Sequence, residues 1–113
     1  MIWWITGNTG AGKSTLAKRI AGAVVLDGDE LRTVWTDLDL SDAGRCEQNL
    51  RAARLAAILS AQGHDVVVST ICPYRELRKR VKDICGCRFV YVPGGAAADA
   101  EHPYETFDQG AGI

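Results

Sequence analysis

The first residues that could do chemistry lie in the run 7–15. It reads G-N-T-G-A-G-K-S-T and matches the pattern G-x-x-x-x-G-K-[ST] at every fixed position. The glycines let main-chain N–H groups turn toward an anion, Lys13 can reach the β- and γ-phosphates of a nucleoside triphosphate, and the Ser14 hydroxyl can hold Mg²⁺. We expect nine residues to bind the nucleotide: Gly7, Asn8, Thr9, Gly10, Ala11, Gly12, Lys13, Ser14 and Thr15.

The surroundings of this loop support a phosphate-binding interpretation. An apolar run, I-W-W-I, precedes it, and residues spaced as in a helix follow it. A strand before and a helix after are the context that the motif requires. A plain glycine-rich turn is the alternative, but it would leave Lys13 and Ser14 without a purpose.

A second polar group follows the next apolar run. Asp27 and Asp29 come directly after it, and Arg32 is three residues further on. A carboxylate there could accept a hydroxyl proton and a guanidinium could hold an anionic acceptor, which are the groups phosphoryl transfer needs. The alternative is structural, with Asp29 capping a helix that starts at Glu30 and Asp27 simply ending a strand.

Hydrophobic patterns predict the elements that position these groups. Apolar and β-branched runs predict strands at 1–6, 23–26, 65–71 and 88–92. Helical spacing predicts helices from the loop to Gly22, over 30–35, from an N-cap at Ser41 to Gln62, and over 76–84, with 76–80 on a solvated face. This order predicts an α/β fold in three layers, a parallel sheet of about four strands with helices on both faces. We expect one domain over 1–93 and an irregular tail over 94–113.

Composition limits the classes of partner. Of 113 residues, 47% are hydrophobic and 24% charged, and the net charge is −1, so nothing overall favours nucleic acid or a membrane. Met1 leads directly into the first strand, which predicts a cytoplasmic protein.

The four cysteines lack metal-ligand spacing and are expected to be reduced thiols, Cys72 being a small buried thiol rather than a reactive one. A thin domain with an open sheet edge leaves room for a homodimer.

Four stretches together resemble the adenylylsulfate kinases, which use ATP to phosphorylate the 3′-hydroxyl of adenosine 5′-phosphosulfate. The stretch 4–15 is similar to W-x-T-G-x-x-G-x-G-K-S-T, 26–32 to L-D-G-D-x-[LI]-R, 71–75 to I-S-P-[YH]-R, and 103–105 to P-Y-E. Between them, 37–48 is similar to D-L-G-F-S-x-x-D-R-x-E-N. The resemblance implies a P-loop kinase fold and covers the chain from its start to about Val92.

The resemblance also implies roles for residues. Lys13 and Asp29 would be catalytic, Asp29 as the base for the acceptor hydroxyl, and Asp27 would support Mg²⁺ through water beside Ser14. Arg32 and Arg45 would hold the 5′ anionic end of the acceptor. Bidentate guanidinium contacts suit phosphate and sulfate oxygens, which agrees with this role. The residues implied for acceptor binding are Arg32, Arg45, Gln48, Ile71, Cys72, Pro73 and Tyr74.

The sequence also departs from the family pattern. Gln48 stands in place of an Asn, Gly44 of an Asp, Leu40 of a Phe and Cys72 of a Ser. The R-D-x-K-G-L-Y lid is missing, because Val92 is followed almost directly by the P-Y-E stretch, and the family's terminal strand and helix have no counterpart. A lid excludes water and brings cations to the transferring phosphate. Three hypotheses therefore stand: an adenylylsulfate kinase-like phosphotransferase, a P-loop kinase for another small hydroxyl or nucleic-acid acceptor, or a nucleotide-binding protein without turnover.

Overall fold

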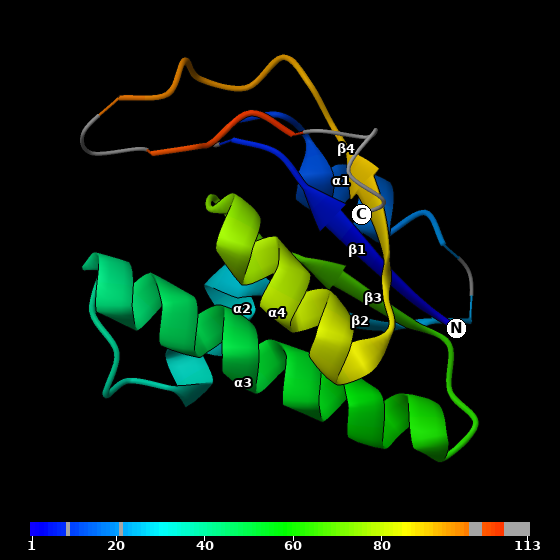
Figure 1. Cartoon of the computed structure of the whole chain (residues 1–113). Helices are drawn as coiled ribbons and strands as arrows, with labels where there is room; N and C mark the ends of the chain where they lie inside the picture. The colour runs from blue at the N-terminus through cyan, green and yellow to red at the C-terminus, as the bar shows by residue number, and fades with distance from the viewer. Residues whose placement is uncertain (9, 21, 100–102, 108–113) are drawn as a thin grey trace.

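A computed structural model describes residues 1–8, 10–20, 22–99 and 103–107 of the chain. Strands and helices alternate along it in the order expected for an α/β fold (Figure 1). The elements are β1 (Ile2–Thr6), α1 (Lys13–Ala17), β2 (Val24–Asp27), α2 (Gly28–Val34), α3 (Asp42–Ala61), β3 (Val66–Ser69), α4 (Arg75–Cys85) and β4 (Arg88–Tyr91).

The four strands form one parallel sheet in the order β2-β3-β1-β4. Trp4 of β1 is paired with Val68 of β3 and with Phe89 of β4, so β1 is central. β2 pairs with β3, where Asp27 lies opposite Ser69. The predicted four-stranded parallel sheet is confirmed. Because the strands are parallel, the carboxyl ends of β1, β2 and β3 lie together at one edge of the sheet.

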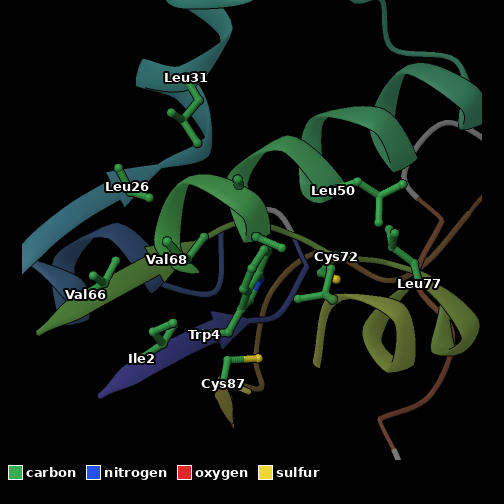
Figure 2. Packing of buried hydrophobic residues seen from close by; sticks show 14 residues of the cluster. Ile2, Trp4, Leu26, Leu31, Leu50, Val66, Val68, Cys72, Leu77 and Cys87 are labelled. Atoms are coloured by element: carbon green, nitrogen blue, oxygen red, sulfur yellow. The ribbon is translucent and has the colours of Figure 1, made fainter. Parts of the chain in front are cut away.

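Helices cover both faces of the sheet, which confirms the three-layer fold. On one face, α3 and α4 pack over a core that includes Trp4, Val66 and Val68 (Figure 2). On the other face, Ala17 of α1 packs against Ile5 and Val67. In Figure 1 the strands lie between α1 behind them and α3 and α4 in front.

One predicted detail of the helices is wrong, and one structural alternative is excluded. The helix after the phosphate loop ends at Ala17 instead of reaching Gly22, because Arg19 N–H and Ile20 N–H bond to carbonyls three residues earlier and turn the chain; Ala21 lies outside the described residues. Asp29 does not cap the next helix. Asp27 does so, since its carboxylate accepts from Asp29 N–H.

The prediction of a solvated face over 76–80 is wrong for Arg78. Its side chain is 0% exposed, and its guanidinium donates to the carbonyl oxygens of Cys72 and Pro73 and to those of Glu105 and Thr106. Among the described residues no carboxylate lies within ion-pair distance of it. The sequence pattern of α4 gave no sign of this, because the acceptors come from a segment far along the chain.

Residues 103–107 return to the body of the protein. The Tyr104 hydroxyl lies 2.8 Å from Thr6 Oγ1, and Glu105 N–H donates to the Pro73 carbonyl. The Glu105 carboxylate accepts from Arg75 N–H at the start of α4, which lacks a side-chain cap of its own. The part of the predicted tail over 108–113 lies outside the described residues.

Two further features concern the chain as a whole. No helix within the described ranges is long and apolar enough to cross a membrane. Cys46, Cys72, Cys85 and Cys87 are all free thiols. Cys85 and Cys87 share a hydrogen bond that lowers the pKa of Cys85 and raises that of Cys87.

Candidate active site

A cavity of about 300 Å³ opens at the carboxyl ends of β1, β2 and β3. This is where ligands bind in open α/β sheets. It brings together most of the residues singled out in the sequence: Gly10, Gly12, Lys13, Ser14, Thr15, Asp27, Asp29, Arg32, Arg45, Gln48, Ile71, Cys72 and Pro73. Gly7, Asn8, Ala11 and Tyr74 do not line it, and Thr9 lies outside the described residues.

The loop between β1 and α1 has the backbone that its glycines predict. Gly10 and Gly12 have φ values of +81° and +92°, the left-handed region that favours glycine. Gly12 precedes the first residue of α1, Lys13, whose ammonium donates to the Asn8 carbonyl at 3.1 Å. Burial lowers the pKa of Lys13, while the charges of Asp29 and Asp27 act in the opposite direction. The loop therefore holds a half-buried cation close to two carboxylates.

Ser14 and Asp27 form a direct pair at the floor of the cavity. The Ser14 hydroxyl donates to Asp27 Oδ1 at 2.6 Å, and Asp27 Oδ2 accepts from Asp29 N–H. The hydroxyl proton is thus used, and the lone pairs of Ser14 Oγ are left for another partner. Hydroxyl and carboxylate oxygens are ligands that suit Mg²⁺. Asp29 itself is exposed at the start of α2.

Two helices form the side of the cavity next to these carboxylates. Arg32 projects from α2, while Arg45 and Gln48 come from the first turns of α3, which begins after the predicted N-cap Ser41. Gln48 is 5% exposed and its amide donates to the Gly28 carbonyl. Gln48 therefore ties α3 to the start of α2, and the two arginines supply positive charge at the cavity wall.

The opposite side is formed by the segment after β3. Cys72 is buried with φ +46°, a conformation that costs free energy in a residue other than glycine. Arg78 holds it there by donating to the Cys72 carbonyl at 2.9 Å. Burial raises the pKa of the Cys72 thiol, in keeping with the expected unreactive thiol. Tyr74 does not line the cavity, and it donates its hydroxyl proton to Asp42 Oδ1.

Five lining residues were not predicted from the sequence, namely Gly28, Asn49, Ser69, Thr70 and Pro103. Thr70 Oγ1 donates to Asn49 Oδ1 at 2.6 Å and accepts from Trp4 Nε1 at 2.9 Å. These groups join the central strand to α3 beneath the cavity. Polar residues at the end of the apolar run 66–68 were the available signal. Pro103 carried only the P-Y-E likeness.

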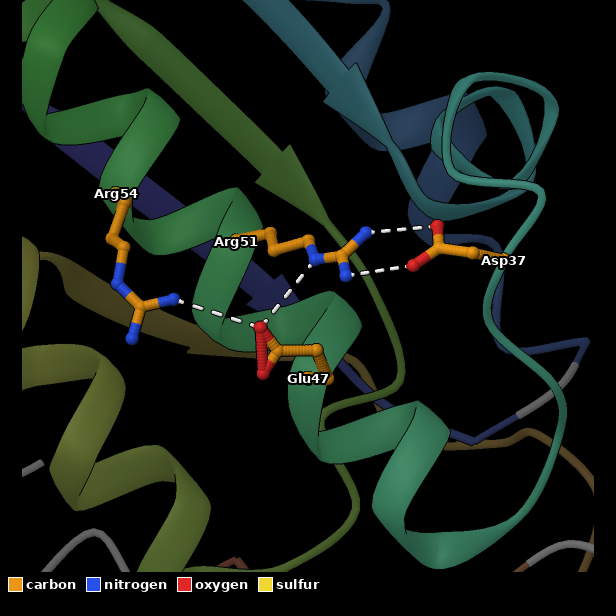
Figure 3. A network of polar contacts seen from close by, with 4 residues as sticks. All are labelled: Asp37, Glu47, Arg51 and Arg54. Carbon is orange, nitrogen blue, oxygen red and sulfur yellow. Dashed lines mark hydrogen bonds and ion pairs between the residues drawn. The ribbon is translucent and has the colours of Figure 1, made fainter.

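An ion-pair network fixes the loop between α2 and α3 (Figure 3). The Arg51 guanidinium donates to both carboxylate oxygens of Asp37, at 3.0 and 2.8 Å. Arg51 and Arg54 also approach Glu47 Oε1, at 3.4 and 3.8 Å. The network is largely exposed, so its role is to hold the loop on α3 rather than to add much stability.

Residues 93–99, which stand where the family lid would begin, run beside the phosphate loop. Asn8 Nδ2 donates to the Ala96 carbonyl at 2.8 Å, and Val92 N–H donates to the Thr6 carbonyl. None of residues 93–99 lines the main cavity. The described part of this segment therefore does not cover the site.

Known proteins are similar to this chain in sequence and in fold. The sequence pattern of adenylylsulphate kinase matches residues 1–100. The adenylyl-sulfate kinase of Paraburkholderia xenovorans is 41% identical over 98 residues, which are 79% of this chain and 55% of that protein. The chain spans about half the length of the curated relatives it matches.

Solved structures agree with this similarity. The Mycobacterium tuberculosis APS kinase, solved in complex with AMPPNP and APS, is 36% identical with a TM-score of 0.68 over 81% of this chain and 60% of that one. A gluconokinase from Sinorhizobium meliloti is 26% identical with a TM-score of 0.60, over 79% of this chain and 55% of that one. The sequence match over nearly the whole chain decides between these two resemblances. The chain belongs to the adenylylsulphate kinase family.

Proposed function

We propose that this chain transfers the γ-phosphate of ATP to the 3′-hydroxyl of adenosine 5′-phosphosulfate. The observation that carries the proposal is the cavity in which Lys13, Ser14 and Asp27 meet Asp29 and, on the facing helices, two arginines. A cation and an oxygen pair suit a magnesium nucleotide, and a carboxylate with guanidinium groups suits an anionic acceptor with a free hydroxyl. Family membership supports the same acceptor.

The proposed nucleotide site uses the loop and its two neighbours. The main-chain N–H groups of residues 7–15 hold the phosphates, and Lys13 leaves the Asn8 carbonyl to bind the β- and γ-phosphates. Ser14 Oγ and, through water, Asp27 hold Mg²⁺, which when bound neutralises charge on the phosphates. The 2.6 Å bond from Ser14 to Asp27 supports this, because it aims the lone pairs of Ser14 away from the carboxylate.

The proposed acceptor site is formed by α2 and α3 next to the carboxylates and by the segment after β3 on the opposite side. Arg32 and Arg45 hold the 5′ anionic end, and Gln48, Ile71, Cys72 and Pro73 form the wall. Tyr74 supports this wall from outside the cavity by bonding to Asp42 near Arg45. Asp29 accepts the proton of the acceptor hydroxyl as its oxygen attacks the γ-phosphorus, and ADP leaves. The charge of Asp29 acts to raise the pKa of Lys13, which supports a carboxylate near the lysine that would bind the γ-phosphate.

Turnover with Mg-ATP and adenosine 5′-phosphosulfate tests the proposal. Ion-exchange chromatography should show ADP and a 3′-phosphorylated product in equal amounts. Asp29→Asn should lower the rate at least about 100-fold, the usual scale of a general base, with AMPPNP affinity retained. Glu30→Gln is the matched control, because Glu30 is the exposed neighbour of Asp29 and does not line the cavity. An equal loss in both variants would contradict the role of Asp29.

A second candidate is nucleotide binding without turnover. The observation in its favour is that residues 93–99 lie beside Asn8 and do not line the cavity, so these residues do not shield the site from water. AMPPNP binding that Lys13→Ala abolishes, together with no transfer to any acceptor, would support it. Transfer to gluconate or another small hydroxyl compound, tested in the same assay, would instead support a different acceptor.

We further propose that the protein acts in the cytoplasm and can pair as a homodimer. β4 ends the sheet and exposes Val90 and Tyr91, each 37% exposed, which supports an open edge available for pairing. Sedimentation of the purified chain with and without Val90→Lys tests the second part.

A further inference from the structure

The hydroxyl of Ser69 stands apart from the other buried polar groups. Within the described ranges it is the one buried side-chain nitrogen or oxygen that has no hydrogen-bond partner in the protein. Ser69 is 2% exposed. A buried hydroxyl without a partner costs free energy that a ligand able to bond to it can recover. A bound ligand could therefore supply the hydrogen-bond partner that the Ser69 hydroxyl lacks among the described residues.

Ser69 lies beneath the phosphate loop. It is the last residue of β3, in register with Ile5 on β1 and with Asp27 on β2. Side chains two residues apart in a strand share a face, and Val67 packs against Ala17 of α1. Ser69 thus faces the α1 side of the sheet and lines the same cavity as Ser14.

The next residue shows that a missing partner is not general at this strand end. Thr70 faces the other side of the sheet and its hydroxyl is bonded to both Trp4 and Asn49. The two hydroxyls are adjacent in sequence and both line the cavity. One serves the internal network, and the other is left for the site.

We propose that Ser69 is a further binding residue of the nucleotide site and accepts a hydrogen bond from a water of the hydrated magnesium-nucleotide complex. This inference rests on the proposed function. Asp27, the register partner of Ser69, would accept from the same shell of water. Mg²⁺ usually keeps several waters in phosphate sites, so oxygen acceptors around those waters add to its affinity. Ser69 then raises affinity for the nucleotide only when the metal is present.

Calorimetry of AMPPNP binding, with Mg²⁺ and with EDTA, measures this dependence. The quantity compared is the dissociation constant with EDTA divided by the dissociation constant with Mg²⁺. It is measured in wild type, Ser69→Ala and Thr70→Val. Ser69→Ala should reduce the ratio about fivefold, the scale of one hydrogen bond, and leave the EDTA value unchanged. Without ligand, Ser69→Ala should unfold at the wild-type temperature or above it. Thr70→Val should unfold at a lower temperature and keep the wild-type ratio.

Each other outcome overturns the inference for a distinct reason. An unchanged ratio in Ser69→Ala would mean that Ser69 does not contact the hydrated complex. If Ser69→Ala weakened AMPPNP binding equally with Mg²⁺ and with EDTA, Ser69 would act by maintaining the shape of the phosphate loop and not by contacting the hydrated complex. A lower unfolding temperature without ligand would mean that Ser69 has an internal partner. Failure of the wild type to bind AMPPNP would overturn the proposed function, and this inference with it.

Discussion

The Arg78 guanidinium carbon lies 4.5 Å from the centre of the Tyr104 ring. The cation is fully buried, and its hydrogen bonds all go to main-chain carbonyls. Carbonyl dipoles and an aromatic face together compensate for a charge taken out of water. Two of the carbonyls belong to Cys72 and Pro73, so the same contact sets one wall of the cavity.

Replacing Arg78 with Met should destabilise the protein by about 3 kcal/mol, because several buried carbonyls lose a charged donor. Urea unfolding measures the change. Arg80→Met is the matched control, since Arg80 is exposed on the same helix, and it should stay within about 0.5 kcal/mol of wild type. Similar losses in the two variants would show that the buried contacts of Arg78 add nothing.

Gly44 should not tolerate a side chain. A Cβ there would overlap the Asp39 carbonyl oxygen and lie 2.6 Å from Asp39 Oδ1. Gly44→Ala should therefore cost about 1–3 kcal/mol, the usual range for overpacking, and Gly44→Asp more. Thermal unfolding measures both. Ala43→Asp, one residue earlier and exposed, should unfold like wild type because an acid in the first turn suits the helix dipole.

The lowered pKa of Lys13 predicts a pH dependence of stability. Below the ordinary value of 10.5 the folded protein releases this proton before the unfolded chain does, so the unfolded chain holds more protons in that range. Stability from Lys13 therefore rises with pH up to 10.5. The unfolding free energy of wild type minus that of Lys13→Met should increase from neutral to alkaline pH. If Lys18→Met, at an exposed lysine, gives the same slope, the effect is only a general loss of charge.

The pair of Asp37 and Arg51 also predicts that stability rises with pH, but in the acid range. The hydrogen bond from Arg51 lowers the pKa of Asp37 below 3.8, so the stability it gives is present above that value and is lost as pH falls through the folded pKa. Asp37→Asn should be slightly less stable than wild type at neutral pH and equal to it in strong acid. High salt should shrink the difference. Denaturation of Asp83→Asn, an exposed acid on α4, is the control.

Local signals predicted much of the fold. The apolar run 66–68 and the loop 7–15 each determine their structure through nearby residues, and Ser41 caps α3 with its own hydroxyl. Residue types also predicted that Lys13, Ser14 and the two aspartates would meet, because parallel strands end at one edge. These inferences needed only short-range chemistry and the rules of parallel sheets.

Long-range partners could not be predicted in this way. Within α4 the sequence does not distinguish Arg78 from the exposed charged residues around it. The partners that bury it lie in residues 104–107. Asp27 and Asp29 both satisfied the same local rule for a helix cap, and Asp27 is the cap because α2 begins at Gly28. Ser69 and Thr70 differ because only the Thr70 hydroxyl meets partners on other elements, Trp4 and Asn49. For Arg78 and Thr70 the deciding contacts lie on other elements.

The contact of Glu105 with Arg75 N–H also affects how the protein folds. The first turn of α4 receives its cap from a residue 30 positions later in the chain. Glu105 N–H also donates to the Pro73 carbonyl at 2.7 Å, just before the helix. Glu105 therefore holds the start of α4 through both its side chain and its main chain. Nascent α4 thus lacks its cap until residues 103–107 arrive. Docking of that segment and completion of α4 are then one cooperative step, in which both gain protection from hydrogen exchange together.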